Sequence, residues 1–223
     1  MNYLYCALLG YLIGTVNPSY LLGKLKGIDI RTKGSGNAGA SNAVILLGKL
    51  VGVLCALFDI SKAYFAVYIA RALFPDFTHA FAVAGVFCII GHIFPFYMGF
   101  RGGKGLACLA GVVFGFNKRV FLLMLTGAII LALITDFICV VPVTASAVFP
   151  VIYGFMTGDV IGALLFGCVF IIIALKHKGN FRRIAAGQEM HLSYLWNSEK
   201  EMERMRANLP QDDKTVNEHF SLK

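Results

Sequence analysis

Long apolar segments, separated by short polar connections, fill the chain from residue 1 to about residue 176. A helix that crosses a bilayer needs about 20 apolar residues. The sequence offers seven such segments, two of them short for a full crossing, at about 3–23, 50–74, 79–98, 105–116, 120–135, 138–156 and 160–176. Because 58% of all residues are hydrophobic and 14% are charged, a water-soluble globular domain is excluded. We expect an all-α integral membrane protein, a compact seven-transmembrane-helix bundle formed by residues 1–193.

The polar connections alternate between the two faces of this bundle and share their basic residues unevenly. One face receives the connections 24–49, 98–104 and 135–137 and the tail from residue 177, and the first two connections and the tail carry most of the loop Lys and Arg. The opposite face collects Arg71, Lys118 and Arg119. Since cytoplasmic loops carry an excess of Lys and Arg, we expect the first face and the C-terminus in the cytoplasm and the N-terminus outside.

Residues 194–223 are predicted to form a cytoplasmic C-terminal tail. Ser198 and Glu201 have the spacing of a helix capping box. The residues that follow share one helix face up to a proline that ends the helix, namely Met202, Met205, Leu209 and Pro210. We expect a short amphipathic helix that lies against the membrane surface.

The net charge of +8 and the six cysteines limit the partners. No basic run with interleaved aromatic residues lies outside the apolar flanks, so nucleic acid is not an expected partner. Anionic lipid headgroups or phosphorylated small molecules suit the charge better. All six cysteines lie within apolar segments and form no CxxC pair, so we expect them to be buried packing residues. No metal site and no cofactor is predicted.

The first polar cluster lies between the first two apolar segments and is rich in glycine. Its candidate binding residues are Gly34, Ser35, Gly36, Asn37, Gly39, Ser41 and Asn42. Glycines let backbone N–H groups approach an anion, and the N-terminus of the helix that follows, at about Asn42, adds its positive dipole end. A flexible loop between helices is the alternative interpretation.

The second cluster combines a cation with glycines at the start of an apolar segment. Its candidate residues are Arg101, Gly102, Gly103, Lys104 and Gly105, with His92 upstream. This arrangement is typical of a phosphate cradle but lacks the residues of a Walker A loop. For His92 alone, a hydrogen-bonded structural role is favoured over a functional one.

The third cluster follows the last apolar segment and contains His177, Asn180, Arg183 and Glu189. Boundary Lys and Arg side chains that extend to lipid headgroups explain the charges of this region but not Asn180 or Glu189. A cationic His177 is also favoured by the C-terminal end of a helix, so its presence does not by itself indicate catalysis. Since hydropathy places all three clusters on one face, the sequence predicts an anion site at the membrane surface.

One acidic and one basic residue stand three positions apart inside the second apolar segment. Asp59 and Lys62 therefore share a helix face and are expected to form a partly buried pair. Structural neutralisation within the bundle is at least as well supported as a contact with substrate.

The chain resembles the integral-membrane acyl-phosphate:glycerol-3-phosphate acyltransferases of bacteria, the PlsY type, and its motifs appear in the order of that family. The resemblance covers about residues 14–189. It is carried by Asn17-Pro18-Ser19, Asp29-Ile30-Arg31, Gly34 to Asn42, Gly91-His92 with Pro95, Gly102 to Gly105, His177 with Asn180, Arg183, and Gly187 with Glu189. It implies a seven-span bundle in the bacterial inner (cytoplasmic) membrane with cytoplasmic motif loops. A monomer is compatible with the residues, which do not fix the oligomeric state.

The resemblance implies transfer of a fatty acyl group from acyl phosphate to the 1-hydroxyl of glycerol 3-phosphate, which gives lysophosphatidic acid and phosphate. The expected partners are these two substrates and membrane lipids. Ser35, Lys104, His177 and Asn180 are the implied catalytic residues, and the other candidates of the three clusters are implied to bind substrate. The general base is either His177 or a substrate phosphate.

One departure from the family pattern leaves an alternative open. Ile45 stands where the family usually has an arginine, so a strong phosphate partner is missing. A divergent paralogue that binds or transports phosphorylated solutes therefore competes with the acyltransferase, as does an inactive interaction protein.

Overall fold

The computed structural model describes residues 1–207, and every element in this range is helical. The α-helices are α1 (Asn2–Thr15), α2 (Pro18–Leu25), α3 (Ala40–Leu47), α4 (Lys49–Leu73), α5 (Ala80–Ile93), α6 (Leu106–Phe116), α7 (Lys118–Thr135), α8 (Val140–Thr157), α9 (Val160–Ala185) and α10 (Ser198–Ala207). Two short 3₁₀ turns cover Phe96–Met98 and Leu192–Leu195. The predicted all-α membrane fold is confirmed.

One of the seven predicted crossings corresponds to a helix that is short for a full crossing. Within the described residues, six helical segments are long and apolar enough to cross a membrane, at Asn2–Leu25, Lys49–Leu73, Ala80–Met98, Lys118–Thr135, Val140–Thr157 and Val160–Ala185. The predicted segment 105–116 forms α6, which has 11 residues. At 1.5 Å per residue such a helix reaches about 16 Å, roughly half of the hydrocarbon core. The count of seven is therefore not confirmed.

The first crossing is broken in the middle, which the continuous segment 3–23 did not predict. α1 ends at Thr15, and Asn17 caps α2 by accepting a hydrogen bond from the Tyr20 backbone N–H (2.9 Å). The break follows from Pro18, which disfavours a helical conformation at the residue before it and suits the first turn of a new helix. The Asn17 amide also donates to the Ala38 carbonyl (2.9 Å), so the break holds the glycine-rich loop.

Glycines allow α1 and α5 to approach at backbone contact distance. A Cβ added at Gly10 would lie 2.2 Å from the Ala84 carbonyl oxygen, and one at Gly14 would lie 2.1 Å from that of Cys88. Gly91 of α5 faces α1 in the same way. Close packing through small residues is typical of membrane helices, where no hydrophobic effect drives association. The contact fixes α5 at the centre of the bundle.

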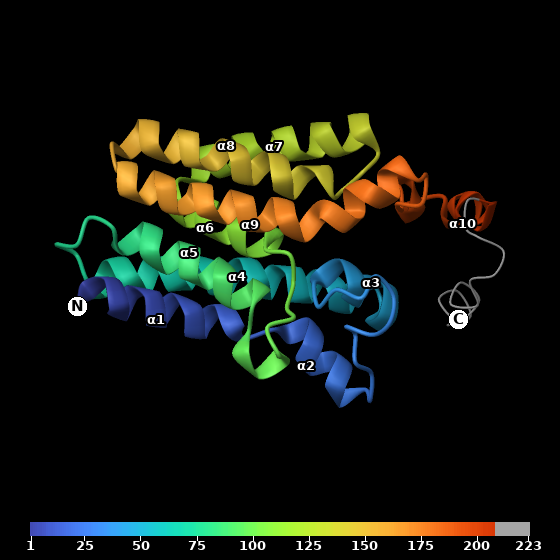
Figure 1. Cartoon of the computed structure of the whole chain (residues 1–223), viewed down its shortest axis with the longest axis horizontal. Helices are drawn as coiled ribbons and strands as arrows, with labels where there is room; N and C mark the ends of the chain where they lie inside the picture. The colour runs from blue at the N-terminus through green and yellow to red at the C-terminus, as the bar shows by residue number, and fades with distance from the viewer. Residues whose placement is uncertain (208–223) are drawn as a thin grey trace.

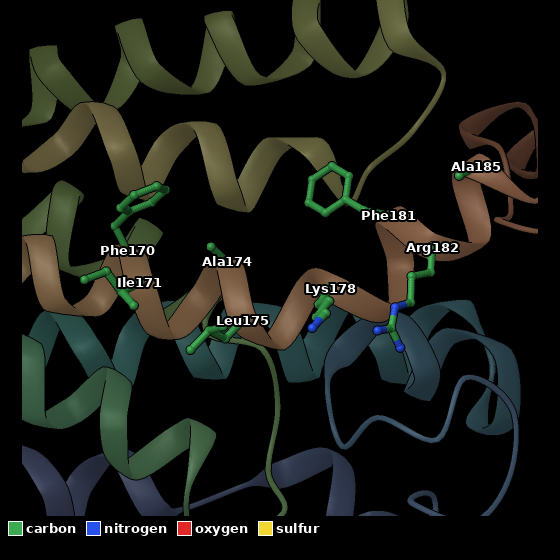
Figure 2. A pocket seen from close by; sticks show the side chains of 8 residues that line it. All are labelled: Phe170, Ile171, Ala174, Leu175, Lys178, Phe181, Arg182 and Ala185. Carbon is green, nitrogen blue, oxygen red and sulfur yellow. The ribbon is translucent and has the colours of Figure 1, made fainter.

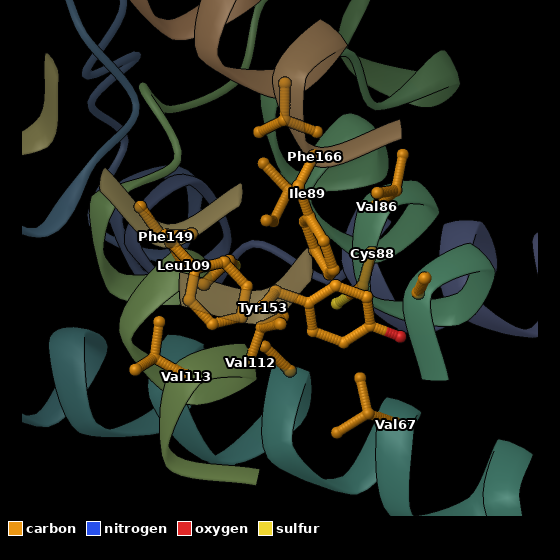
Figure 3. Close-up of a cluster of buried hydrophobic side chains, with 14 of the residues drawn as sticks. Val67, Val86, Cys88, Ile89, Leu109, Val112, Val113, Phe149, Tyr153 and Phe166 are labelled. Carbon is orange, nitrogen blue, oxygen red and sulfur yellow. The ribbon is translucent and has the colours of Figure 1, made fainter. Parts of the chain in front are cut away.

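The largest cluster of buried side chains surrounds α5 and α6, and Phe149, Tyr153 and Phe166 from α8 and α9 close it (Figure 3). Five of the six cysteines are buried as predicted, but Cys168 on α9 is exposed. The prediction for Cys168 was wrong because an apolar segment does not tell which of its faces contacts protein and which contacts lipid.

The helices run roughly along one axis, and α3 lies with the C-terminal end of α9 at the end of the bundle opposite the N-terminus (Figure 1). α3 starts at Ala40, slightly before the predicted helix start, and Gly48 separates it from α4 with a φ of +100°. Only Val120 and Ala132 of α7 are buried, as expected for a helix that faces lipid. The three polar clusters are therefore brought to one end.

The predicted tail helix is present as α10, which begins at Ser198. Its Glu201 carboxylate accepts hydrogen bonds from the His191 backbone N–H (2.9 Å) and from Arg204 (2.6 Å). The capping box stays a prediction, because the Ser198 side chain lies outside the described residues. The predicted apolar face is outside the description: the Met202 and Met205 side chains and the residues Leu209 and Pro210 lie beyond the described part of the chain.

Candidate active site

A cavity of about 240 Å³ joins the three polar clusters. It is lined by Ser35, Gly36, Asn37, Arg101, Gly102, Gly103, Lys104, Lys176, Gly179, Asn180 and Arg183. Four of these side chains are basic, and they come from two segments far apart in the sequence. The fold thus brings the three polar clusters together at one cavity, as predicted.

The first loop takes its shape from a buried amide. The Asn42 side chain is fully buried; its oxygen accepts the Ser35 backbone N–H (2.9 Å), and its nitrogen donates to the carbonyls of Ile30 (2.6 Å) and Lys33 (3.0 Å). Gly34 has a φ of +58°, which disfavours residues with a side chain, and an added Cβ would meet the Asn42 side chain. Asn42 therefore holds Ser35 at the cavity without lining it.

Arg31 supports the same loop from outside the cavity. Its guanidinium pairs with the Asp29 carboxylate (2.7 Å), donates to the Met98 carbonyl (2.5 Å) and lies over the Tyr20 ring (4.8 Å). The side-chain hydrogen bond from Arg31 is the main reason why the pKa of Asp29 falls to about 2. Arg31 is thus fully engaged in holding the 26–33 connection against the segment that precedes the second cluster.

The second loop packs on top of His92. The Gly103 N–H donates to the His92 carbonyl (3.1 Å), and the Gly102 N–H donates to the Ile93 carbonyl (3.0 Å). A Cβ on Gly102 would lie 2.1 Å from the His92 carbonyl oxygen, and one on Gly103 would lie 2.1 Å from His92 Nε2. Both glycines are needed because the backbone approaches α5 so closely. His92 lies behind the loop and does not line the cavity.

The predicted Asp59–Lys62 pair is present and fully buried, and His92 extends it. Lys62 Nζ lies 2.6 Å from Asp59 Oδ1 and 3.2 Å from His92 Nδ1, and it donates to the Val16 carbonyl (2.5 Å) at the α1–α2 break. Potential metal ligands of Asp59, His92 and Cys108 lie within 4.8 Å of one another. The Lys62 ammonium lies within this cluster. We therefore interpret the cluster as a structural network beneath the second loop rather than as a metal site.

Lys104 projects into the cavity and connects the second cluster to the third. Its Nζ donates to the Asn180 side-chain oxygen (2.5 Å). Burial and, after it, the neighbouring Arg183 lower the pKa of Lys104 below its ordinary value. The Asn180 nitrogen donates to the Glu189 carboxylate (2.5 Å), which also accepts Arg183 Nε (2.7 Å). Glu189 therefore orients two cavity residues from behind.

His177 lies one helical turn before Asn180 and is buried. Its Nδ1 is 2.8 Å from the Ile173 carbonyl oxygen. Because a carbonyl only accepts, Nδ1 carries the proton, and Nε2 is the acceptor nitrogen of the neutral ring. His177 does not line the cavity surface itself.

The predicted site residues divide into two groups. Those that line the cavity are Ser35, Gly36, Asn37, Arg101, Gly102, Gly103, Lys104, Asn180 and Arg183. Those that lie outside its lining are Gly34, Gly39, Ser41, Asn42, His92, Gly105, His177 and Glu189. Among the second group, Ser41 is exposed on α3, and Gly39 and Gly105 precede α3 and α6 as their N-terminal caps.

Two cavity residues, Lys176 and Gly179, were not predicted as site residues. Lys176 was attributed to the membrane boundary. Its spacing could have predicted its place in the cavity, because residues 176, 180 and 183 recur at helical intervals and share one face of α9. The four converging cations with glycine-rich loops make the cavity suited to phosphate groups.

Comparison with known proteins agrees with this chemistry. The family model described as glycerol-3-phosphate acyltransferase matches residues 4–187. A glycerol-3-phosphate acyltransferase of Francisella tularensis subsp. holarctica is 36% identical over 195 residues, which cover 85% of this chain and 93% of that one. Glycerol-3-phosphate acyltransferase 1 of Oceanobacillus iheyensis is 34% identical over 203 residues, which cover 88% and 98%.

The fold is shared with crystal structures of PlsY (YgiH), an integral membrane glycerol 3-phosphate acyltransferase. The glycerol 3-phosphate form superposes with a TM-score of 0.78 at 29% identity and covers 87% of this chain and 98% of that chain. The lysophosphatidic acid form superposes with a TM-score of 0.74 at the same identity and covers 86% and 95%. On its sequence match and its fold together, this chain belongs to the glycerol-3-phosphate acyltransferase family of integral membrane proteins.

Proposed function

We propose that this protein transfers a fatty acyl group from acyl phosphate to the 1-hydroxyl of glycerol 3-phosphate and releases lysophosphatidic acid and inorganic phosphate. The observation that carries the proposal is the convergence of Arg101, Lys104, Lys176 and Arg183 on one cavity. Both substrates are phosphorylated, and a family relative has been crystallised in glycerol 3-phosphate and lysophosphatidic acid forms. A cavity with this charge suits two such anions.

In this reaction the protein mainly has to position the two substrates and stabilise the developing charge. The acceptor oxygen forms a bond to the acyl carbonyl carbon, the bond from that carbon to the phosphate oxygen breaks, and the hydroxyl proton leaves with the phosphate or a base. Because acyl phosphate is already activated, correct alignment of the two substrates supplies much of the barrier lowering, about 7–11 kcal/mol for well-oriented reactants. Cations that hold two anions together oppose their mutual repulsion and stabilise the developing oxyanion.

Each cluster is assigned a part of this task. The Ser35 hydroxyl and the Asn37 side chain bind phosphate, with Gly36 beside them. Lys104 provides a second anion site, on a loop that the Gly102 and Gly103 N–H groups fasten to α5, and Asn180 orients the Lys104 ammonium. His177 Nε2, one turn away on α9, is the protein's candidate proton acceptor, and a substrate phosphate is the other.

A groove along α9 suits the acyl chain of the donor. Its volume is about 800 Å³, and its lining is mostly apolar, with Phe170, Ile171, Ala174, Leu175, Lys178, Phe181, Arg182 and Ala185. Phe170 and Phe181 point to one side of the helix, and Lys178 and Arg182 to the other (Figure 2). The apolar part suits methylene groups, and the basic part lies on the same helix turns as the cavity residues Gly179 and Arg183.

We place the cavity on the cytoplasmic side of a bacterial inner membrane, with the N-terminus outside and the C-terminus inside. The cavity end of the bundle carries most of the basic loop residues, and the opposite end carries Arg71, Lys118 and Arg119. Residues 1–193 form the catalytic membrane domain in this proposal, and residues 194–223 form a cytoplasmic tail.

The test is product analysis with purified protein. Given acyl phosphate and glycerol 3-phosphate, without nucleotide, coenzyme A or added metal, the protein is expected to form lysophosphatidic acid and phosphate in equal amounts. Omission of glycerol 3-phosphate should abolish the lipid product. Uptake of glycerol 3-phosphate into proteoliposomes without any lipid product would instead support a solute transporter and contradict the acyltransferase.

A further inference from the structure

An arginine of the C-terminal tail, Arg204, contacts the active-site network. Arg204 of α10 donates Nη1 to the Gly187 carbonyl (2.7 Å) and Nη2 to the Glu189 carbonyl (2.7 Å). The family model ends at residue 187, so Arg204 lies outside the part of the chain that the family shares. Its contacts therefore are a feature of this chain that family membership does not explain.

The segment that Arg204 binds is the one that holds two cavity residues. The Glu189 carboxylate accepts hydrogen bonds from Asn180 (2.5 Å) and Arg183 (2.7 Å), and Asn180 accepts one from Lys104 (2.5 Å). A continuous series of polar contacts thus leads from the tail helix to the cation in the cavity.

The backbone at Glu189 is held from both sides. On one side, its N–H donates to the Arg183 carbonyl (3.2 Å), and Gly187 ends the helix with a φ of +68°. On the other side, its carbonyl accepts the Arg204 guanidinium, which also binds the Gly187 carbonyl. These carbonyls lie past the end of α9, where no further helical N–H groups are available to donate to them. The guanidinium supplies these donors instead.

Arg204 is itself fixed by a buried carboxylate. Glu201 is 5% exposed and pairs with the guanidinium through both of its oxygens, at 2.6 and 2.9 Å. Its carboxylate also accepts the His191 backbone N–H (2.9 Å). A buried carboxylate needs such partners, so Glu201 holds the fork of Arg204 in one orientation.

A second anchor joins the tail to the bundle. Asp136, between α7 and α8, accepts the Ser193 backbone N–H (3.0 Å) and lies 3.2 Å from His191 Nδ1. The Asp136 carbonyl accepts the Leu192 backbone N–H (2.7 Å). The chain between Glu189 and α10 is therefore fastened at both ends, which limits where Arg204 can lie.

We propose that Arg204 is a positioning residue for the acyl transfer, because its guanidinium fixes the Glu189 segment and thereby sets Asn180 and Arg183 for binding of glycerol 3-phosphate. This inference rests on the proposed function. It assigns the tail helix a task in substrate binding, although none of the α10 residues that the structure describes lines the cavity.

The test compares full-length Arg204→Ala and Arg204→Lys with a control on the same helix, Lys200→Ala. Lys200 is exposed, and its substitution changes the net charge by the same amount. We expect Arg204→Ala to raise the KM for glycerol 3-phosphate about 5- to 10-fold and Arg204→Lys to raise it less, because lysine keeps the charge but loses the planar fork. Lys200→Ala should keep the KM of the unmodified protein.

A purely structural role for Arg204 would reduce the amount of folded enzyme and leave the KM of the remaining enzyme unchanged, so the KM distinguishes the two. Glu201→Gln provides a milder variant should Arg204→Ala fold poorly, and it should move the KM in the same direction. In combination with Glu189→Gln, Arg204→Ala should add less than about a twofold further change, since both act through one network.

Failure of this inference is distinguishable from failure of the proposed function. Lysophosphatidic acid from the unmodified protein, together with an unchanged KM in Arg204→Ala and Glu201→Gln, overturns the role of Arg204 alone. Full additivity with Glu189→Gln does the same. Absence of product from the unmodified protein overturns the proposed function and with it the catalytic meaning of Arg204.

Discussion

Burial and charge act in opposite directions on Lys104. Burial favours the neutral amine, and Arg183 adds like-charge repulsion, so the pKa of Lys104 lies below its ordinary value. A bound phosphate dianion would favour the charged form again. Binding of an anionic substrate and protonation of Lys104 are therefore coupled, and this coupling makes Lys104 the most informative single residue of the cavity.

Removal of the Lys104 ammonium should abolish most of the turnover. In Lys104→Ala we expect kcat/KM to fall about 100-fold or more, because a preorganised cation at the reacting phosphates is lost. The thermal unfolding temperature in detergent should change little. Lys26→Ala removes an exposed lysine of the neighbouring connection and serves as the control. Turnover in Lys104→Ala equal to that of this control would contradict the assigned role.

The depressed pKa of Lys104 also predicts a pH dependence. The ammonium is lost as the pH rises through the pKa, so kcat/KM for glycerol 3-phosphate should decrease on the alkaline side at a pH below the ordinary lysine value of about 10.4. In Lys104→Arg this decrease should move to higher pH, since a guanidinium remains protonated. The measurement is a pH profile corrected for spontaneous acyl phosphate hydrolysis. An alkaline limb that is identical in both proteins would assign the titration to another group.

Ile45 is the position where the family resemblance predicts an arginine. It is 38% exposed on α3, four residues after Ser41 and on the same helix face. We expect Ile45→Arg to lower the KM for glycerol 3-phosphate about threefold or more, because a bidentate partner for phosphate is restored. Ile45→Gln, which adds length without charge, is the matched control. An unchanged KM would indicate that Lys176 and Arg183 already supply the missing charge.

At the scale of helices, the contact between α1 and α5 sets the position of the second loop. Gly14 lies against the Cys88 backbone, and the next turns of α5 carry His92, on which Gly103 packs. A change in the α1–α5 distance is therefore transmitted to Lys104.

Gly14→Ala tests this packing. A methyl group at this position would lie 2.1 Å from a backbone oxygen, and such overpacking typically costs about 1–3 kcal/mol. We expect a lower unfolding temperature in detergent together with a loss of activity. Gly127→Ala on the exposed helix α7 is the control: its Cβ meets nothing within 4 Å, and alanine is the better helix former. Equal stability of the two variants would show that the α1–α5 contact can relax.

The sequence predicted the helices better than their depth and faces. Apolar length identifies a membrane helix, but it does not reveal that Asn17 and Pro18 interrupt the first crossing or that α6 has only 11 residues. The motif loops were found because glycine, cations and amides stand out against apolar flanks. The roles of Asn42, His92 and Glu189 behind the cavity depend on contacts between distant residues, which residue type alone does not disclose.

The same limit explains the tail. Ser198 and Glu201 have capping-box spacing, and that spacing does not disclose that the Glu201 carboxylate binds Arg204 and the His191 backbone N–H. The boundary at residues 193 and 194 stays a prediction, and the hydrogen bonds of Arg204 cross it.

At the scale of the whole molecule, the charge is polarised along the bundle. The end with the cavity carries the basic loops, whereas Lys118 and Arg119 lie at the other end with the connection that joins α6 and α7. This asymmetry is the physical basis of the proposed orientation.

Cysteine labelling in intact cells tests the orientation. Arg119→Cys should react with a membrane-impermeant maleimide in intact cells, and Lys26→Cys should react only after lysis, since both positions are exposed but lie at opposite ends. The unmodified chain provides the background, because five of its cysteines are buried and Cys168 lies within an apolar helix. The reverse pattern would invert the proposed topology.

The position of the short helix α6 affects how a donor with a fatty chain meets a water-soluble acceptor. Gly105 caps α6 against Ile89 and Ile93 of α5, so the loop that carries Lys104 is sunk alongside the last turns of a crossing helix rather than raised above it. A donor anchored by its hydrocarbon tail can then diffuse sideways within the leaflet to the reaction centre, and only the small hydrophilic acceptor has to change phase.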